Sequence, residues 1–339
     1  MNGNIPQVIH FVPWAEIGGT ERVVQNLCLT GGEYRHLVLF AQSGPAVSEF
    51  ERRHIRVLRP GEITDLARLA MTELQANSPI VLHAHIMKYN HVEHALILAR
   101  ALGVPGLFTL HGREILPPVP WPLVCVSPSV SRAQVHNFER TLVIPNGVSL
   151  AEFSPPVHRT QRSSIVLTVV ARARRIPDYF WQCVDRIRSV RENCQIWIVG
   201  QDGESDRQVK YFGVRGDVSK ILAMSDIFIY APRPFHGAHD LTVLEAMASG
   251  LPCICTNVSG VAESITHMHD GILVPFGAID PFVTAALDLM SSTELRYSLG
   301  RHARETVAAN FTIEKCWFRY RSAYAGLLGI SDQSPSTPA

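Results

Sequence analysis

The chain is organised around the stretch Pro234-Phe235-His236-Gly237-Ala238-His239-Asp240-Leu241-Thr242-Val243-Leu244-Glu245-Ala246-Met247-Ala248-Ser249-Gly250-Leu251-Pro252-Cys253-Ile254-Cys255-Thr256. Its pattern predicts a loop, a helix, a tight stop and a strand, in that order. Asp240 is a candidate N-cap of the helix, and Gly250 followed by Pro252 is typical of a helix end.

The predicted helix is apolar around most of its circumference, which indicates that it is largely buried. Thr242, Glu245 and Ser249 are the exception, because their spacing of three and four places them on one face. A carboxylate in apolar surroundings needs hydrogen-bond partners, or it neutralises. Glu245 therefore lies on a solvated face, pairs with an Arg, or accepts hydrogen bonds from the hydroxyls of a ligand in a cleft.

Three motifs that start in this helix resemble the donor-site signature of the family 4 retaining glycosyltransferases, the glycosyl transferases group 1. They are residues 244–252, 256–263 and 271–275. In that family two glutamates lie eight positions apart, and the second binds the ribose of a sugar nucleotide. Glu245 matches the second glutamate, whereas Gly237 stands where the first is expected.

The resemblance implies an α/β chain with the GT-B fold, in which two Rossmann-like parallel-sheet domains face each other across a cleft. We expect an N-terminal, acceptor-side domain at residues 1–150 and a donor-nucleotide domain at residues 151–312. The last helix, residues 313–328, is expected to cross back to the N-terminal domain, and residues 329–339 to be a disordered tail. A length of 339 residues and the alternation of strand and helix patterns also favour two parallel α/β domains.

Composition excludes some classes of function. A net charge of +1 gives no strong field for nucleic acid. The seven cysteines are scattered, which favours reduced thiols, and no apolar run approaches the length of a membrane span. We expect a cytoplasmic protein. The cluster of Arg52, Arg53, Arg56 and Arg59 leaves open a peripheral contact with the inner face of the cell membrane, although a solvated face is the preferred interpretation.

Polar residues follow several predicted strands of the N-terminal half. Gly18 and Gly19 precede a helix, where backbone amides favour an anion. His83, His85 and His111 lie at strand ends, where open α/β sheets bind ligands. Ordinary half-buried histidines are the alternative interpretation for two of the three. His111 matches a family histidine that faces the donor sugar, and the spacing favours no zinc site.

Arginines follow the first strand of the second half. Three guanidiniums at Arg172, Arg174 and Arg175 suit an anion, since Arg matches phosphate with two parallel donors. A solvated loop is the alternative interpretation. In the family an Arg and a Lys five residues later hold the diphosphate. Arg172 matches the Arg, but Pro177 occupies the Lys position, so Arg174 or Arg175 is expected to supply the second cation.

We therefore expect a retaining hexosyltransferase-type enzyme that moves a sugar from a nucleoside diphosphate donor, of UDP or GDP type, to an acceptor hydroxyl. His111, Arg172 and Arg174 are the expected catalytic residues. The expected donor-binding residues are Gly18, Gly19, Arg172, Arg175, Gly213, Val214, His239, Asp240, Leu241, Thr242 and Glu245. No cofactor is expected, and no metal, because the chain has no Asp-x-Asp motif. His239 or Asp240 would replace the contact that Gly237 lacks.

The acceptor is expected to be a carbohydrate, a lipid-linked molecule or a small molecule. Cell-surface polysaccharide or lipopolysaccharide assembly is the preferred role, and tailoring of a secondary metabolite is the alternative. A catalytically impaired nucleotide-sugar-binding partner of an active transferase is a second class of function. A phosphorylase of the same fold is a third, but Lys210, Lys220 and Lys315 lie in no matching pyridoxal-phosphate motif.

Overall fold

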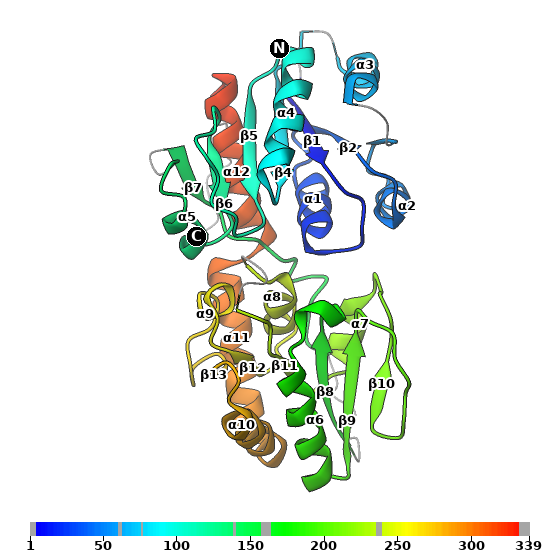
Figure 1. Cartoon of the computed structure of the whole chain (residues 1–339), viewed down its shortest axis with the longest axis vertical. Coiled ribbons are helices and arrows are strands. Elements are labelled where there is room, and N and C mark those ends of the chain that lie inside the picture. Colours follow the sequence, from blue (N-terminus) through cyan, green and yellow to red (C-terminus); the bar gives the residue numbers. More distant parts are fainter. Residues whose placement is uncertain are drawn as a thin grey trace. The chain divides into compact units, whose positions relative to one another are not determined.

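The computed structural model describes residues 5–59, 63–75, 77–137, 140–156, 164–234 and 239–331. Gly237 and residues 332–339 of the expected tail lie outside the described residues. The chain divides into a first unit of Met1–Gly147 with Ile313–Ala339 and a second unit of Val148–Thr312. Each unit is a parallel sheet flanked by helices (Figure 1), so the predicted pair of Rossmann-like domains is confirmed.

The sheet of the first unit has the strand order β3-β2-β1-β4-β5-β6-β7. The strands are β1 (Gln7–Val12), β2 (Arg35–Phe40), β3 (Val57–Leu58), β4 (Ile80–Ile86), β5 (Gly106–Leu110), β6 (Leu123–Cys125) and β7 (Thr141–Val143). All their printed pairings are parallel, and the order reverses between β1 and β4. Such a reversal opens a crevice at the carboxyl ends of the strands.

Helices cover both faces of this sheet. They are α1 (Gly19–Thr30), α2 (Pro45–Arg52), α3 (Ile63–Glu73), α4 (Tyr89–Leu102), α5 (Pro128–Ala133) and the C-terminal α12 (Ile313–Leu328). Helix α12 packs against α1 and over β4, whereas α3 packs against α4 (Figure 1). Right-handed crossovers place α1 and α4 on opposite faces because β2 and β5 lie on opposite sides of the β1–β4 pair.

The second unit has the strand order β10-β9-β8-β11-β12-β13. Its strands are β8 (Ile165–Val170), β9 (Cys194–Val199), β10 (Val209–Tyr211), β11 (Ile227–Tyr230), β12 (Cys253–Thr256) and β13 (Ile272–Val274). Its helices are η2 (Ala173–Arg175), α6 (Asp178–Val190), α7 (Val218–Ala223), α8 (Leu241–Ala248), α9 (Ser259–Ala262), α10 (Ile279–Ser291) and α11 (Thr293–Asn310). Helix α6 packs against α10, and α8 packs against α11.

The helix predicted in the opening stretch is α8, and it is almost wholly buried. Asp240 occupies the predicted N-cap position, but its carboxylate makes no side-chain capping bond and pairs with Arg175 instead. The predicted stop is confirmed, because Gly250 has φ +69° and the amide of Leu251 bonds back to the carbonyl of Ala246 at 3.1 Å. A left-handed residue directly after a helix is a common end that glycine adopts without strain.

Close packing fixes α8 against α11. A Cβ atom on Gly300 would lie 2.2 Å from the carbonyl oxygen of Gly250, so only glycine allows this approach. Arg304, one turn further along α11, donates to the carbonyl oxygens of Ala248, Phe153 (2.7 Å) and Leu150 (3.2 Å). One guanidinium therefore satisfies the end of α8, as a cation near a helix C-terminus should.

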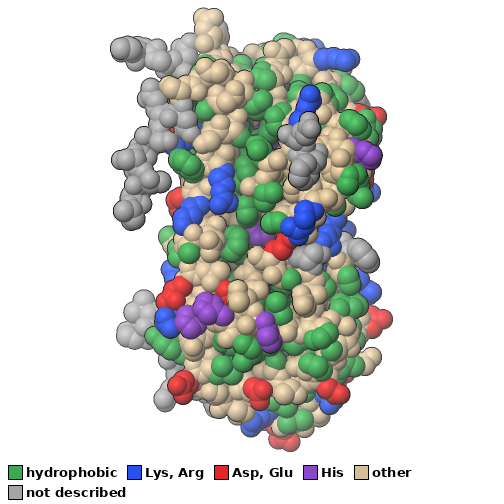
Figure 2. All heavy atoms as spheres, turned by 90° about the vertical axis from the view of Figure 1, so that its left-hand side faces the viewer, with side chains coloured by type: hydrophobic (Ala, Val, Ile, Leu, Met, Phe, Trp, Pro, Cys, Tyr) green, Lys and Arg blue, Asp and Glu red, His purple; other side chains and the backbone are tan. Residues whose placement is uncertain are grey.

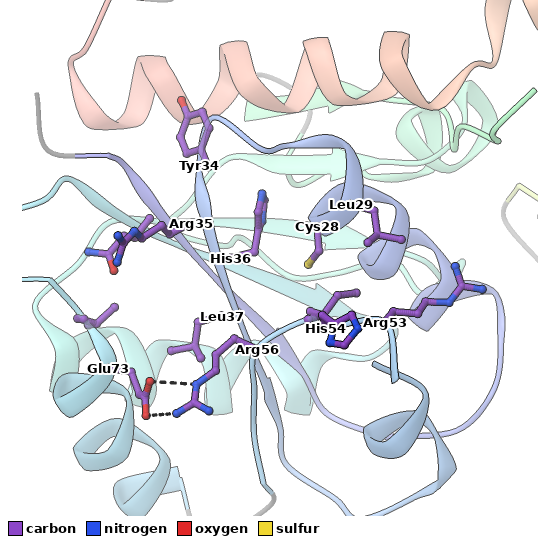
Figure 3. A pocket seen from close by; sticks show the side chains of 13 residues that line it. Cys28, Leu29, Tyr34, Arg35, His36, Leu37, Arg53, His54, Arg56 and Glu73 are labelled. Atoms are coloured by element: carbon purple, nitrogen blue, oxygen red, sulfur yellow. Dashed lines mark hydrogen bonds and ion pairs between the residues drawn. The ribbon is translucent and has the colours of Figure 1, made fainter. Parts of the chain in front are cut away.

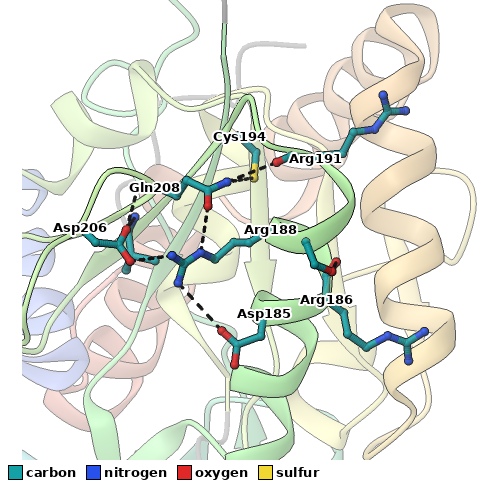
Figure 4. Close-up of polar contacts among 9 residues, drawn as sticks. Asp185, Arg186, Arg188, Arg191, Cys194, Asp206 and Gln208 are labelled. Atoms are coloured by element: carbon teal, nitrogen blue, oxygen red, sulfur yellow. Dashed lines mark hydrogen bonds and ion pairs between the residues drawn. The ribbon is translucent and has the colours of Figure 1, made fainter.

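Arg188 of α6 fastens the loop between β9 and β10. Its guanidinium donates to Asp206 at 2.6 Å and to Gln208 at 3.3 Å, and Asp206 also accepts the amide of Val209 at 2.7 Å (Figure 4). On the face drawn in Figure 2, outside the grey atoms, acidic and basic side chains are interspersed with apolar ones. Among the described residues, no helix combines the length and the hydropathy that crossing a bilayer requires.

Candidate functional site

The three candidate arginines follow the carboxyl end of β8, but the structure gives them different surroundings. Arg174 is exposed and makes no ion pair among the described residues, and Arg172 is half-buried at the start of η2. Arg175 is half-buried, and its Nη1 lies 2.8 Å from Oδ1 of Asp240. Arg175 also lies beside the Tyr230 hydroxyl, whose pKa is raised by burial. The three arginines are therefore not equivalent.

The Arg175–Asp240 pair joins the loop after β8 to the N-terminus of α8. The Asp240 side chain is 6% exposed and the Arg175 side chain 33%, so the acid is buried while the base reaches solvent. Because Asp240 faces Arg175, its carboxylate does not compete for the first backbone amides of α8 at Leu241 and Thr242. Those amides carry the partial positive charge of a helix N-terminus, which suits a phosphate.

Glu245 lies one turn further along α8 and is 7% exposed, so the solvated-face alternative is wrong. Thr242 is half-buried on the same face. The Ser249 hydroxyl donates to the backbone carbonyl of Glu245 at 2.9 Å, so this third member of the stripe is occupied within the helix. The polar stripe therefore reduces to Thr242 and Glu245.

His239 is buried against the interior of the second unit. Its Nε2 lies 3.2 Å from the Ser264 hydroxyl, and its ring packs 5.5 Å from that of Phe311. Burial lowers the pKa of His239 to about 4, so the ring is neutral at pH 7. These contacts hold one ring nitrogen and one ring face inside the unit. The prediction that His239 replaces a family acid at the donor sugar stays untested.

The remaining candidates lie on loops at strand ends. Gly213, two residues after β10, has φ +64°, and its carbonyl accepts the amide of Gly200 at 2.7 Å. Val214 is 55% exposed. Gly200 has φ +100°, and a Cβ there would lie 2.9 Å from the carbonyl oxygen of Ala171. The ends of β8, β9 and β10 are thus held together by backbone contacts that side chains would block.

In the first unit the Gly18–Gly19 pair begins α1. Gly18 is the N-cap residue in extended conformation, and Gly19 is exposed. Because Gly18 has no side chain, no capping bond from the N-cap residue competes with an anion for the first turn of α1.

His111 follows β5 and belongs to a row of histidines. Its Nε2 lies 3.0 Å from Nδ1 of His85, whose Nε2 lies 3.1 Å from Nδ1 of His10. His10 Nε2 in turn lies 2.9 Å from Nδ1 of His36. The sequence interpretation missed His10 and His36. The signal that could have found them is a histidine on each of three neighbouring parallel strands, with side chains on one face.

His83 lies beside this row but bonds elsewhere. Its two ring nitrogens each lie 2.6 Å from a hydroxyl, Nδ1 from that of Tyr324 on α12 and Nε2 from that of Thr109 on β5. The Thr109 hydroxyl also lies 3.1 Å from that of Tyr320. Helix α12 is therefore fixed to the sheet by polar contacts as well as by burial.

A hollow of about 410 Å³ lies near the amino ends of β1, β2 and β3. His36 and Cys28 are among the residues that line it (Figure 3). Arg56 and Glu73 also line it and are hydrogen-bonded to each other, with Arg56 Nε 3.0 Å from Glu73 Oε2. The candidate ligand residues lie at the carboxyl ends of the strands, so this hollow does not contain them.

Comparisons with known proteins agree with the resemblance stated from the motifs. Residues 164–292 match the model of the family described as Glycosyl transferases group 1. A curated relative from Escherichia coli, UDP-Gal:alpha-D-GlcNAc-diphosphoundecaprenol alpha-1,3-galactosyltransferase, is 28% identical over 214 residues, or 55% of this chain and 54% of that protein. The chain spans about half the length, or less, of the first curated relatives it matches.

Solved structures share the whole fold at low identity. A glycosyltransferase from Rickettsia africae ESF-5 has a TM-score of 0.81 at 18% identity, covering 98% of this chain and all of that one. Anabaena HepE, solved in complex with UDP and glucose, has a TM-score of 0.77 at 15% identity, covering 95% and 100% of the two chains. The resemblance to group 1 glycosyltransferases and the GT-B type of fold are therefore confirmed.

Proposed function

We propose that this chain transfers a sugar from a nucleoside diphosphate donor to an acceptor hydroxyl, with retention at the anomeric carbon. The observation that carries the proposal is the buried Glu245 on α8, inside the segment that matches the group 1 family. In this proposal the carboxylate accepts hydrogen bonds from the ribose hydroxyls. Hydrogen bonds to an ionised acceptor are about twice as strong as neutral ones.

The diphosphate would bind at the loop after β8 and the N-terminus of α8. Arg172 and Arg174 are the cations in this proposal, because Arg175 is already paired with Asp240. The amides of Leu241 and Thr242 add neutral donors. Negative charge grows on the departing diphosphate as the sugar acquires oxocarbenium character, so fixed donors there stabilise the transition state more than the ground state. Donors of this kind need no cofactor or metal, and turnover is expected to survive EDTA.

A donor of the UDP type and a lipid-linked or carbohydrate acceptor are the preferred substrates. The printed name of the Escherichia coli relative contains UDP-Gal and a diphosphoundecaprenol-linked acceptor, and Anabaena HepE was solved with UDP. A third relative, Lipopolysaccharide glucosyltransferase WaaG of Escherichia coli, is 26% identical over 34% of this chain, and its name supports a role in cell-surface polysaccharide or lipopolysaccharide assembly. In this proposal the protein acts in the cytoplasm or at the inner face of the membrane. Tailoring of a secondary metabolite is the alternative.

The decisive experiment measures donor binding by thermal shift across a panel of nucleotide sugars. Glu245→Gln removes the charge and keeps the shape, so donor affinity should fall about 10- to 100-fold, as expected for a hydrogen bond to a charged group. Glu305→Gln, an exposed residue of α11 paired with Arg301, is the matched control and should bind donor as the wild type does. Equal donor affinity of wild type and Glu245→Gln would refute the ribose assignment.

A second candidate function is a nucleotide-sugar-binding partner without catalysis. Pro177, a buried proline that precedes α6, motivates it, because it supplies no cation where the family has a Lys. The two functions differ in one measurement, nucleotide release from a bound donor. An enzyme releases nucleotide faster when the right acceptor is added, whereas a binding partner releases none with any acceptor.

A further inference from the structure

Four histidines of the first unit form a continuous diagonal row across its sheet. His36 lies on β2, His10 on β1 and His85 on β4, and His111 follows β5. His36 pairs with Val8, His10 with His83, and His85 with Thr109. On each next strand, the histidine of the row therefore lies two residues beyond the residue that pairs with the preceding histidine. Because the side-chain period of a strand is two, the row stays on one face.

The rings meet edge to edge. Their centroids are 5.2, 5.4 and 5.3 Å apart, while the facing nitrogens are only 2.9, 3.1 and 3.0 Å apart. The interplanar angles are 17°, 27° and 24°. Nearly coplanar rings whose nitrogens point at each other at these distances have the geometry of N–H···N hydrogen bonds.

The row has one direction, and a backbone carbonyl sets it. Nε2 of His36 lies 2.9 Å from the carbonyl oxygen of Gly31, which can only accept. His36 Nε2 therefore carries the hydrogen, and in a neutral ring Nδ1 is a bare acceptor. His10 must then donate from Nε2 and accept at Nδ1. The same reasoning passes through His85 to His111, which donates from Nε2 to His85.

All four rings are neutral at pH 7. Burial lowers the pKa of His36 to about 4 and that of His111 to about 3, and holds those of His10 and His85 well below the usual value. Four neutral imidazoles carry four N–H groups, and the four hydrogen bonds use all of them. One lone pair is left over, on Nδ1 of His111, which makes no hydrogen bond among the described residues.

We propose that His36, His10 and His85 are positioning residues that fix the tautomer of His111, so that its Nδ1 meets a ligand only as a hydrogen-bond acceptor. A hydroxyl or amide N–H of a ligand would satisfy this nitrogen, whereas a carboxylate would face a second lone pair. The row thus selects a ligand group that donates a hydrogen bond, such as a sugar hydroxyl, over a carboxylate. This last step rests on the proposed function; the tautomer itself does not.

A metal ion is the competing explanation of the cluster. His10, His83 and His85 form one group of ligand atoms within 4.8 Å of one another, and His10, Cys28 and His36 form another. Two imidazoles approach a shared zinc ion from different directions, whereas these rings face each other in line. The first group contains no anionic ligand to balance a buried cation, and in the second burial raises the pKa of the Cys28 thiol and so favours its neutral form. The hydrogen-bonded row accounts for the geometry without an ion.

The tautomers can be measured directly by long-range ¹H–¹⁵N correlation spectra of the full chain with ¹⁵N-labelled histidine. We expect His111 of the wild type to be protonated only at Nε2 between pH 6 and 8. His36→Phe removes the acceptor for His10, so the row loses its fixed direction and the His111 signals should shift toward a mixture. His36 borders the hollow of Figure 3, which leaves room for the ring.

Two further variants separate hydrogen bonding from packing. His36→Gln keeps one group that donates to Gly31 and one that accepts from His10, so it should restore the wild-type tautomer. His83→Gln changes a neighbour on the same face that is outside the row and should leave the His111 signals in place. Protonation of wild-type His111 at Nδ1, or an unchanged signal in His36→Phe, would overturn the proposal. The wild-type spectrum decides even if a variant fails to fold.

Ligand selection is tested with UDP-glucose and UDP-glucuronate. Wild type should prefer UDP-glucose by about tenfold, the size of one neutral hydrogen bond, and the preference should shrink in His36→Phe. Equal preference in the two proteins would overturn the selection. If the spectra agree but no nucleotide sugar binds the wild type, the proposed function fails and the row stands. Stoichiometric zinc that shifts the histidine signals of the purified chain would establish the metal site instead.

Discussion

The two units share a parallel-sheet architecture but fasten their helices to it by different means. In the first unit, the His83 imidazole and the Thr109 hydroxyl of the sheet hydrogen-bond to the hydroxyls of Tyr324 and Tyr320 on α12. In the second unit, Gly300 of α11 packs against the backbone of Gly250, just after α8, and Arg304 donates to three carbonyl oxygens. The contacts in the first unit depend on the protonation state of histidine, and those in the second on the volume of the side chains where the helices meet. Parallel α/β sheets thus tolerate both polar and close-packed interiors, and most buried polar groups of such interiors are hydrogen-bonded.

The largest expected difference between the two units is in their stability at acidic pH. The folded-state pKa values of the four histidines of the row lie below the unfolded value, so the stability they contribute is complete above about pH 6.5. It is lost as the pH falls below about 6.5 and through the folded-state pKa values, which are about 4 for His36 and about 3 for His111. The loss should reach several kcal/mol, since each pKa unit corresponds to about 1.4 kcal/mol. Hydrogen exchange should show amides of the first unit losing protection first.

The second unit should lose less stability in acid. Burial lowers the pKa of its His239 to about 4, but that histidine is not part of a row of hydrogen-bonded histidines. His36→Phe removes one titrating group, so the free energy of unfolding should depend less steeply on pH between 6.5 and 4 than in the wild type. Identical pH slopes for the two proteins would contradict this account.

Gly300→Ala tests the close-packed interior of the second unit. Its Cβ would lie 2.2 Å from the Gly250 carbonyl oxygen, so α8 and α11 must move apart. We expect a loss of about 3 kcal/mol in the free energy of unfolding, measured with urea. Gly326→Ala is the matched control, because its Cβ meets nothing within 4 Å on α12. The control should gain about 0.5–1 kcal/mol from helix propensity. Equal effects would show that the helix contact is not tight.

Arg304→Met should cost less. The methionine keeps much of the packing but leaves the carbonyls of Ala248, Phe153 and Leu150 without their donor. We expect a loss of about 2 kcal/mol in urea unfolding, as for hydrogen bonds to a charged group. Arg301→Met, in an exposed pair with Glu305 on the same helix, should cost only about 0.5 kcal/mol. A loss that is no larger for Arg304 would remove its anchoring role.

Removing a helix cap should have the smallest effect on the free energy of unfolding, and the effect should be the same in the two units. Ser127 caps α5 in the first unit by accepting the amide of Val130 at 3.4 Å. Ser292 caps α11 in the second unit by accepting the amide of Leu295 at 3.1 Å. Replacing either serine by Ala should cost about 1 kcal/mol in thermal or urea unfolding. Unequal losses would mean that the contrast between the units extends beyond their interiors.

Much of the architecture could be predicted from local pattern. The last helix, Ile313–Leu328, has the expected bounds, because apolar period and the residues around its ends mark them. The side-chain partner of Asp240 could not be predicted. The cap rule considers only the adjacent helix, whereas Arg175 reaches Asp240 from another strand end 65 residues away.

The candidate site divides in the same way. Glu245 was found by its place in a polar stripe, and its burial agrees with a role other than a solvated face. Ser249 was assigned to the same stripe by spacing, but its hydroxyl bonds within the helix. Spacing shows which residues share a face of the helix, but it does not show which of their side chains hydrogen-bond to the backbone of the same helix.

Two parallel α/β sheets, the helix α8 and the donor-type motifs can be predicted from the sequence, since hydrophobic period and glycine positions act over a few residues. Which polar groups meet depends on the way the strands and helices pack together. His10, His36, His85 and His111 are far apart in the chain, and strand order and register bring their rings into one row. The register of the strands is set by packing of the whole sheet, and no short stretch of sequence specifies it. The hydrogen bond from His36 to the carbonyl oxygen of Gly31 then gives the row its direction.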